Sequence, residues 1–411
     1  STAASCRTAD ALEEMALEQY VPPQTKVETK ERLLTPLFLL VTASTFAYFV
    51  SVGALQPTLP RFVEGPLGRG DVAVGLVIGA FAFSAVIIRP AVGPLGDRRG
   101  RRLLMVAGAG IVTLSVLGYT IADSLPPLIM LRLLAGAGEA LFYVGAASVI
   151  NDLAPEARRG EALSYFSLAL YSGLAVGPVI GEQTLDVSTF DAVWLVAAAS
   201  AGIAALFGLA VKDTRPEGAA EKRSFRWFHP AGLLPGSVLA ASILGLGGFA
   251  TFTPLYALDL GMDGSRLVFV TFSAVVMLVR SVGARIPDML GPKRAASTAL
   301  SLQGGGLTIM GLWHEPAGLF VGAFVFGLGQ ALAFPALMTM AIRSAPATER
   351  SAVVGTFTAF FDLAFGLGAI SLGGVASIAG YGGAFVTAAA VAFAGLAVLT
   401  ARGRMGAAQP A

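Results

Sequence analysis

The sequence has few of the residues on which disulfide-bonded proteins, metalloproteins and most enzymes depend. It contains one cysteine, Cys6, so no disulfide can form within the chain. Its two histidines, His229 and His314, stand far apart, which argues against a histidine metal site. No Gly-x-x-x-x-Gly-Lys-Ser/Thr motif for ATP is present, and no nucleophile, base and acid form a catalytic pattern. We therefore expect no metal, no cofactor and no enzymatic activity.

Charge is also scarce. Asp, Glu, Lys and Arg make up 13% of the chain, against about 25% in a soluble domain, whereas hydrophobic residues make up 55%. The formal net charge is only +2, and the basic residues are spread over short segments, so we expect no nucleic-acid partner. This composition predicts a polytopic membrane protein embedded in a lipid bilayer.

Apolar runs of about 20 residues, bounded by charge, glycine or proline, predict an all-α membrane protein with twelve spanning helices in two pseudo-symmetric six-helix bundles. The first six spans are 35–59, 72–93, 103–122, 125–150, 162–184 and 191–211, and the second six are 231–257, 266–287, 295–312, 317–342, 353–376 and 382–401. The predicted domains are a tail (1–32), a first bundle (33–211), a linker (212–230), a second bundle (231–402) and a tail (403–411).

The distribution of Lys and Arg predicts the orientation in the membrane. Most of these 28 residues lie in the tails and in the loops on one side, whereas the opposite loops hold only Arg61, Arg69 and Arg266. Because Lys and Arg near helix ends are retained in the cytoplasm, we expect a plasma (inner) membrane protein with both termini cytoplasmic. No cationic stretch leads into an apolar core in 1–32, so we expect no cleaved signal peptide.

The two halves of the chain repeat each other at a fixed offset of 191 residues. Nine like-for-like matches follow without a gap, among them Arg89 with Arg280, Gly100 with Gly291 and Gly177 with Gly368. Six spans in each repeat give two halves of equal topology, related by an axis along the membrane normal, with the ligand site between them at mid-depth. This is the architecture of a secondary transporter.

A glycine-rich and cationic motif, GPLGDRRGRR, occupies 93–102 between the second and third spans, and 283–293 is its degraded second copy. The motif resembles the signature of the major facilitator superfamily, and the resemblance covers nearly all of 33–402. Physically, Gly96 and Gly100 permit a tight turn, and Asp97 can cap the next helix or pair with Arg101. The resemblance implies a cytoplasmic gate, whose alternative is a topology anchor without gating. The candidate gate residues are Gly93, Asp97, Arg98, Arg101, Arg89, Arg280 and Asp288.

Two further stretches bear on the direction of transport. Arg132-Leu-Leu-Ala-Gly136 is similar to the signature of proton-linked members, and 173–181 is similar to the antiporter signature of drug/proton exporters, with Glu182 and Ser164 where that pattern has glycine. The glycines of 173–181 recur every four residues, so they let another helix approach closely; packing without a role in exchange is the alternative. The residues concerned are Gly173, Gly177, Pro178 and Gly181.

Two carboxyl groups, those of Glu139 and Asp362, lie near the middle of predicted spans. Burial in hydrocarbon penalises a charge by several kcal/mol unless it is paired or hydrated, so such a carboxyl can bind and release a proton. The offset of 191 relates them to the neutral residues Gln330 and Tyr171, and symmetric scaffolding does not predict this asymmetry. We predict that both acids couple transport to protons, assisted by Arg132 two turns before Glu139. A structural ion pair is the alternative.

The resemblance implies that the first, fourth, seventh and tenth spans line a central cavity. The polar and aromatic candidates for substrate binding are Tyr48, Gln56, Phe142, Tyr143, Phe252, Tyr256, Gln330 and Phe334. A cavity rich in such rings suits an amphipathic or apolar solute.

Together these patterns predict a proton-coupled exporter of small organic molecules that works by alternating access and acts as a monomer. Its predicted partners are the solute, protons and the bilayer. The first alternative is a proton symporter that imports an organic solute such as a carboxylate or a sugar. The second is a membrane sensor or scaffold that transports nothing.

Overall fold

The computed structural model describes residues 33–155, 158–214, 229–282, 289–343 and 349–405, and in this part of the chain every regular element is helical. The tail 1–32, most of the linker, Asp288 and the residues beyond 405 lie outside it. In chain order the elements are α2 (Pro36–Glu64), α3 (Asp71–Arg99), α4 (Arg101–Leu117), η1 (Gly118–Ile121), α5 (Leu125–Leu153), α6 (Arg159–Val187), α7 (Phe190–Ala210), α8 (Pro230–Asp259), α9 (Arg266–Val282), α11 (Pro292–Leu312), α12 (Pro316–Arg343) and α13 (Arg350–Met405).

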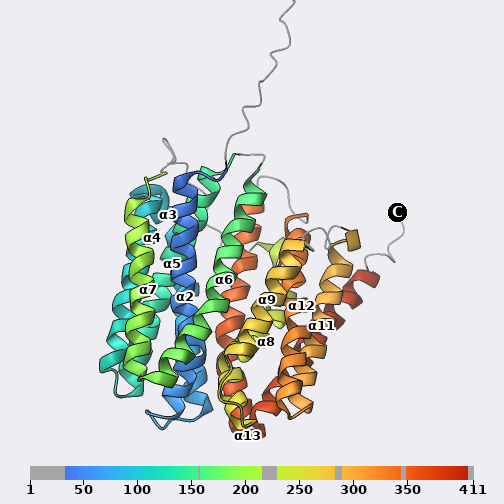
Figure 1. Ribbon diagram of the computed structural model, residues 1–411. Helices are drawn as coiled ribbons and strands as arrows, with labels where there is room; N and C mark the ends of the chain where they lie inside the picture. The colour runs from blue at the N-terminus through green and yellow to red at the C-terminus, as the bar shows by residue number, and fades with distance from the viewer. Residues whose placement is uncertain (1–32, 156–157, 215–228, 283–288, 344–348, 406–411) are drawn as a thin grey trace, which may run out of the picture.

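Nine helices of the described residues are long and apolar enough to cross a membrane, with α13 counted once. A straight helix of 56 residues would be about 84 Å long, far more than a hydrocarbon core of about 30 Å. The backbone of α13 leaves the helical region at Gly380 (φ 71°, ψ 176°). Figure 1 shows that α13 folds back on itself. The predicted all-helical membrane fold is confirmed, and the count of twelve spans stays a prediction.

The helices form two sets. Helices α2–α7, the first set, pack mainly against one another, and so do α8–α13, the second set; the sets meet where α3 contacts α13, α6 contacts α9 and α2 contacts α8. The start of α2 and the end of α13 lie at one end of the molecule, here named the termini side, and α6 ends at the opposite, far side (Figure 1). The boundaries predicted at 211 and 231 stay a prediction, because most of the intervening segment is outside the described residues.

The motif 93–102 turns the chain at one glycine only. Gly100 has a φ of 99°, and Gly291, its equivalent in the repeat, has a φ of 77°, a region that glycine occupies without steric cost. Gly96, by contrast, is helical, because α3 continues to Arg99, so the prediction of a turn at Gly96 is wrong. The predicted gate residues Gly93 and Arg98 therefore lie in the last turns of α3, at the termini side.

Asp213, a residue outside the sequence motif, caps the start of α4, whereas the side chain of Asp97, the predicted cap, lies outside the described part of the structure. Oδ1 of Asp213 accepts hydrogen bonds from the backbone N–H groups of Arg101 (3.0 Å) and Arg102 (3.5 Å). The side chain of Arg101 pairs with Asp152, which also accepts a hydrogen bond from Thr214 (2.7 Å). This charged cluster joins α4, α5 and the residues after α7 at the termini side.

The glycines of α6 let it pack closely against α2, as their spacing predicts. A Cβ atom added to Gly177 would lie 2.6 Å from Cα of Gly53, and one added to Gly173 would lie 2.7 Å from the carbonyl oxygen of Phe46. Only hydrogen fits at such separations, so the backbones of α2 and α6 depend on these glycines. Whether this packing serves exchange stays a prediction.

Candidate functional site

A cavity of about 310 Å³ lies between the two sets of helices, and α2, α3, α5 and α6 of the first set and α8, α9, α12 and α13 of the second set line it. The lining is rich in aromatic rings. It also holds four charged side chains, which are Arg89, Glu139, Arg280 and Asp362. Ligand pockets commonly measure about 300–1,000 Å³, so this cavity suits a small organic molecule.

Equivalent positions of the two halves face the same space. Adding 191 to Phe81 gives Phe272, to Arg89 gives Arg280 and to Glu139 gives Gln330, and all six line the cavity. The same offset relates six further lining pairs: Ala82 with Ser273, Tyr143 with Phe334, Ser167 with Thr358, Leu170 with Phe361, Tyr171 with Asp362, and Leu174 with Phe365. Residues that are equivalent in the sequence repeat therefore line the same cavity from both halves, in accord with a ligand site between two related halves.

Arg89 joins the two acids that the sequence singles out. Its Nη2 donates a hydrogen bond to Oε2 of Glu139 at 3.0 Å, within the first set. Its Nη1 lies 3.0 Å from Oδ2 of Asp362, in the second set, at ion-pair distance but without the angles of a hydrogen bond. The relative exposure of the three side chains is between 10% and 20%. One guanidinium therefore links the two sets through two carboxylates.

Arg280, the equivalent of Arg89, has different surroundings. Its Cζ lies 4.7 Å from the centre of the Tyr171 ring, in a cation–π contact across the two sets. Its Nε is buried without a hydrogen-bond partner, and no carboxylate of the described residues lies within 4.0 Å of its nitrogens. The predicted gate residues Arg89 and Arg280 thus line the cavity itself.

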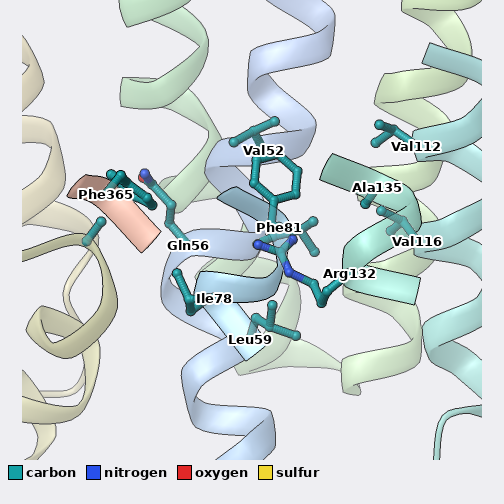
Figure 2. Close-up of a pocket in the computed structure, with 12 residues that line it drawn as sticks. Val52, Gln56, Leu59, Ile78, Phe81, Val112, Val116, Arg132, Ala135 and Phe365 are labelled. Atoms are coloured by element: carbon teal, nitrogen blue, oxygen red, sulfur yellow. The ribbon is translucent and has the colours of Figure 1, made fainter. Parts of the chain in front are cut away.

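Arg132 lines a side pocket of about 80 Å³, and the arginine that bonds to Glu139 in the described structure is Arg89. Its Nε donates to the carbonyl oxygen of Val77 at 3.2 Å, and its guanidinium lies over the ring of Phe81, with Cζ 4.5 Å from the ring centre. Figure 2 shows the guanidinium of Arg132 beside Phe81, with Gln56 on the side of the pocket where Phe365 lies. Gln56 and Phe81 also line the main cavity, so the two spaces are neighbours. A role of Arg132 in coupling stays a prediction.

Four of the eight predicted substrate residues line the cavity: Gln56, Tyr143, Gln330 and Phe334. Tyr48 and Phe142 do not, because their rings stack on each other at 3.9 Å and both side chains are fully buried. The cavity-facing stripe of α2 is instead Phe49, Val52 and Gln56. Tyr48 is one residue before this stripe, about 100° around the helix.

Phe252 and Tyr256 also lie outside the cavity lining. Phe252 packs on the ring of Tyr381 at 6.2 Å, and Oη of Tyr256 donates to the carbonyl oxygen of Met310 at 3.0 Å. Both rings belong to the core on the C-terminal side of the cavity-lining part of α8, which ends with Phe249 and Ala250.

Most of the aromatic lining was not predicted from the sequence. The resemblance points to the first, fourth, seventh and tenth spans, whereas α3, α6, α9 and α13 contribute as many walls, including Phe81, Tyr171, Phe272 and Phe361. The repeat carries a signal for these residues, since equivalent polar or aromatic positions in both halves mark the shared face.

A second link between the sets lies at the far side. The carboxylate of Glu182, which is 1% exposed, accepts hydrogen bonds from N and Oγ of Ser265 (both 2.8 Å) and from N of Arg266 (2.9 Å). Glu182 of α6 therefore caps the start of α9, where a negative charge is favourable. Nη1 of Arg266 also pairs with Oδ2 of Asp186 at 2.6 Å. We call Glu182, Asp186, Ser265 and Arg266 the far-side latch.

Comparisons with known proteins agree with this arrangement. The model of the Major Facilitator Superfamily matches residues 41–314 and 267–408. An uncharacterised transporter of this type from Salmonella typhimurium is 27% identical over 376 residues, covering 87% of this chain and 94% of its own, and one from Burkholderia mallei is 27% identical over 368 residues, covering 88% and 90%.

Solved structures are similar in fold. A bacterial homologue of the human lysosomal transporter Spinster, in an inward-facing and occupied conformation, has a TM-score of 0.77 at 14% identity, over 89% of this chain and 96% of its own. The human organic anion transporter MFSD10 has a TM-score of 0.69 at 17% identity, over 88% and 98%.

Proposed function

The chain belongs to the Major Facilitator Superfamily and is a multi-pass membrane transporter, and on that premise we propose that it exports small amphipathic organic molecules in exchange for protons. The observation that carries this proposal is the position of Arg89 between Glu139 and Asp362 at the cavity wall. Both acids line the space that a solute would occupy, so a proton and a solute can compete for the same environment.

The coupling step follows from the charge balance of this group. With both acids ionised, Arg89 is held by one carboxylate from each set of helices. A proton on Asp362 removes the charge that attracts Arg89 across the sets, and the guanidinium then pairs with Glu139 alone. Protonation of Asp362 thereby weakens the Arg89–Asp362 contact, which must change when the two sets of helices move relative to each other. The solute occupies the cavity in the part of the cycle in which the proton is absent.

The proposed direction of transport rests on the Lys and Arg residues of the loops and on the far-side latch. The predicted cytoplasmic side is the termini side, where most Lys and Arg residues lie. The far-side latch joins α6 to α9 at the opposite end. We assign this conformation to the state that takes up solute from the cytoplasm, in the plasma membrane, with release after the latch opens. The resemblance of 173–181 to the antiporter signature supports export.

Flux measurements test the proposal. Purified protein in liposomes is given two fluorescent probes of permanent charge, 2-naphthalenesulfonate and (2-naphthylmethyl)trimethylammonium, under pH gradients of both signs. Exchange predicts uptake of at least one probe into vesicles with an acidic interior, because protons leave as the probe enters. Uptake driven by an acidic exterior would instead show symport, and the absence of movement of either probe under both gradients would contradict the proposed function.

A further inference from the structure

We infer that Arg280 binds an anionic group of the transported solute, which makes the solute an aromatic or amphipathic organic anion such as a carboxylate, sulfonate or phosphate ester. This inference rests on the proposed transport function and adds the chemical class of its substrate. It follows from a comparison of two equivalent arginines in one cavity, which differ in whether the protein supplies their counter-ions.

The repeat gives each cavity arginine the same neighbourhood of positions. Arg89 contacts Glu139 in its own set and Asp362 in the other set. The offset of 191 places Gln330 and Tyr171 in the corresponding positions around Arg280. Tyr171 does face Arg280, with its ring 4.7 Å from Cζ, so the cross-set contact is kept while its charge is lost. Gln330 is engaged elsewhere, because its Oε1 accepts a hydrogen bond from Gln303 at 2.7 Å.

Arg280 therefore has at least one N–H donor that no described residue accepts. Its guanidinium carries five N–H groups, and Nε is buried without an acceptor among the described residues. A buried charge needs a partner of opposite sign or water. Both carboxylates of the cavity wall lie against Arg89, and no described carboxylate lies within 4.0 Å of Arg280, which contacts the ring of Tyr171. The polar edge of this guanidinium is left for an anion that enters the cavity.

The net charge of the whole site also favours an anionic solute. The cavity and its side pocket are lined by Arg89, Arg132 and Arg280 against Glu139 and Asp362, so one positive charge remains when both acids are ionised. An anion completes this balance, whereas a cation would add a second uncompensated positive charge. Two to three turns before Arg280, the same face of α9 adds Phe269, Phe272 and Ser273 to the cavity wall. The two rings suit an aromatic solute, and the Ser273 hydroxyl can donate a hydrogen bond to an oxygen.

Equilibrium binding to the full-length protein in detergent tests the inference without any need for coupling. The probes are 2-naphthalenesulfonate, its neutral analogue 2-naphthalenesulfonamide and (2-naphthylmethyl)trimethylammonium, measured by fluorescence. We expect the wild-type protein to bind the sulfonate at least tenfold more tightly than either of the others. Arg280→Gln should weaken sulfonate binding at least tenfold, and Arg280→Lys, which keeps the charge, should weaken it less.

Arg343→Gln is the matched control, because it removes one positive charge at the exposed end of α12 and should change the sulfonate affinity less than threefold. The inference is overturned if the wild-type protein does not prefer the sulfonate, or if Arg280→Gln binds it as the control does. If Arg280→Gln does not fold, the wild-type comparison of sulfonate with sulfonamide still tests the anionic class of the solute, and Arg280→Lys tests the contribution of the arginine. Failure of the proposed function is a separate result, namely sulfonate binding that depends on Arg280 without movement driven by a pH gradient.

Discussion

Arg89 shows how one side chain can connect proton binding to the motion of helices. Its two contacts of 3.0 Å reach an acid on α5 and an acid on α13, so the charge of each acid affects how firmly the arginine is held by the other. A surface ion pair contributes little to stability, but a pair in a cavity walled by aromatic rings is screened much less by water. The protonation of either acid is therefore expected to change the contact between the two sets.

Neutralising the acids should uncouple transport. We expect Asp362→Asn and Glu139→Gln each to abolish probe movement driven by a pH gradient, because neither variant carries an exchangeable proton at that position. Exchange of the probe at equal pH should persist in at least one of them. Accumulation at the wild-type level in both variants would remove these residues from the coupling mechanism.

Removing Arg89 should cost stability as well as coupling. Arg89→Gln leaves two carboxyl groups at the cavity wall without their cation. Breaking a buried ion pair in this way costs about 3–5 kcal/mol, and the lower end is expected here because the side chains are partly exposed. Thermal unfolding in detergent should show a lower midpoint for Arg89→Gln. The double variant Arg89→Gln/Asp362→Asn should recover part of that loss. A double variant no more stable than Arg89→Gln would show that charge balance is not what Arg89 provides.

The contact of α2 with α6 depends on glycines of both helices. Gly177→Ala places a methyl group about 2.6 Å from Cα of Gly53, and such overpacking costs about 1–3 kcal/mol. Gly110→Ala in α4 is the matched control, because no atom lies within 4 Å of a Cβ there and alanine favours helix by up to about 1 kcal/mol. We expect a lower unfolding temperature for the first variant and an equal or higher one for the second. Equal midpoints would contradict the close-packing role of Gly177.

The far-side latch should set the balance between conformations. Glu182→Gln keeps the shape of the side chain but replaces one acceptor oxygen by a donor, so the hydrogen bonds to Ser265 and Arg266 weaken. Spin labels at the exposed residues Gln183 and Asp263, in a chain whose single cysteine is replaced, report the separation of α6 and α9 by double electron–electron resonance. We expect the variant to populate longer distances than the wild-type protein. An unchanged distance distribution would show that the latch does not hold the closed far side.

The sequence predicts where the helices lie along the chain better than it predicts which side of each helix faces the cavity. Apolar runs locate α2, α3 and α7 within a few residues, although α3 extends through six more residues, to Arg99, than the apolar run 72–93 predicts. Polar residues continue a helix where it leaves the hydrocarbon, and hydropathy does not report that. The rotation of a helix about its axis is set by its neighbours, and a helix that is apolar all round carries little sign of it. Tyr48 and Phe49 are adjacent, yet only Phe49 lines the cavity.

At the scale of the molecule, the repeat explains why the site is asymmetric within a symmetric frame. Duplicated positions such as Phe81 and Phe272 build matching walls, while the unpaired acids Glu139 and Asp362 stand opposite neutral equivalents. Mid-depth acids and the repeat could be read from the sequence. The joint contact of both acids with Arg89 could not, because it requires the packing of α3 between α5 and α13.

The orientation of the whole molecule can be tested with its native cysteine. Cys6 is predicted to lie in the cytoplasm, so a membrane-impermeant maleimide should label it only after cells are permeabilised. Gln183→Cys, in a chain with Cys6 replaced by serine, should react in intact cells, because residue 183 is exposed near the far end of α6. Labelling of Cys6 in intact cells would reverse the assigned orientation and with it the direction of export.

Gly380 has a practical consequence for anyone who manipulates this transporter. The two limbs of α13 are joined there within a single residue of positive φ rather than by a loop, and side chains rarely adopt that geometry. No flexible loop is present at this hairpin to accommodate an inserted epitope tag, protease site or fused reporter. Such an insertion would displace the part of α13 that carries Asp362.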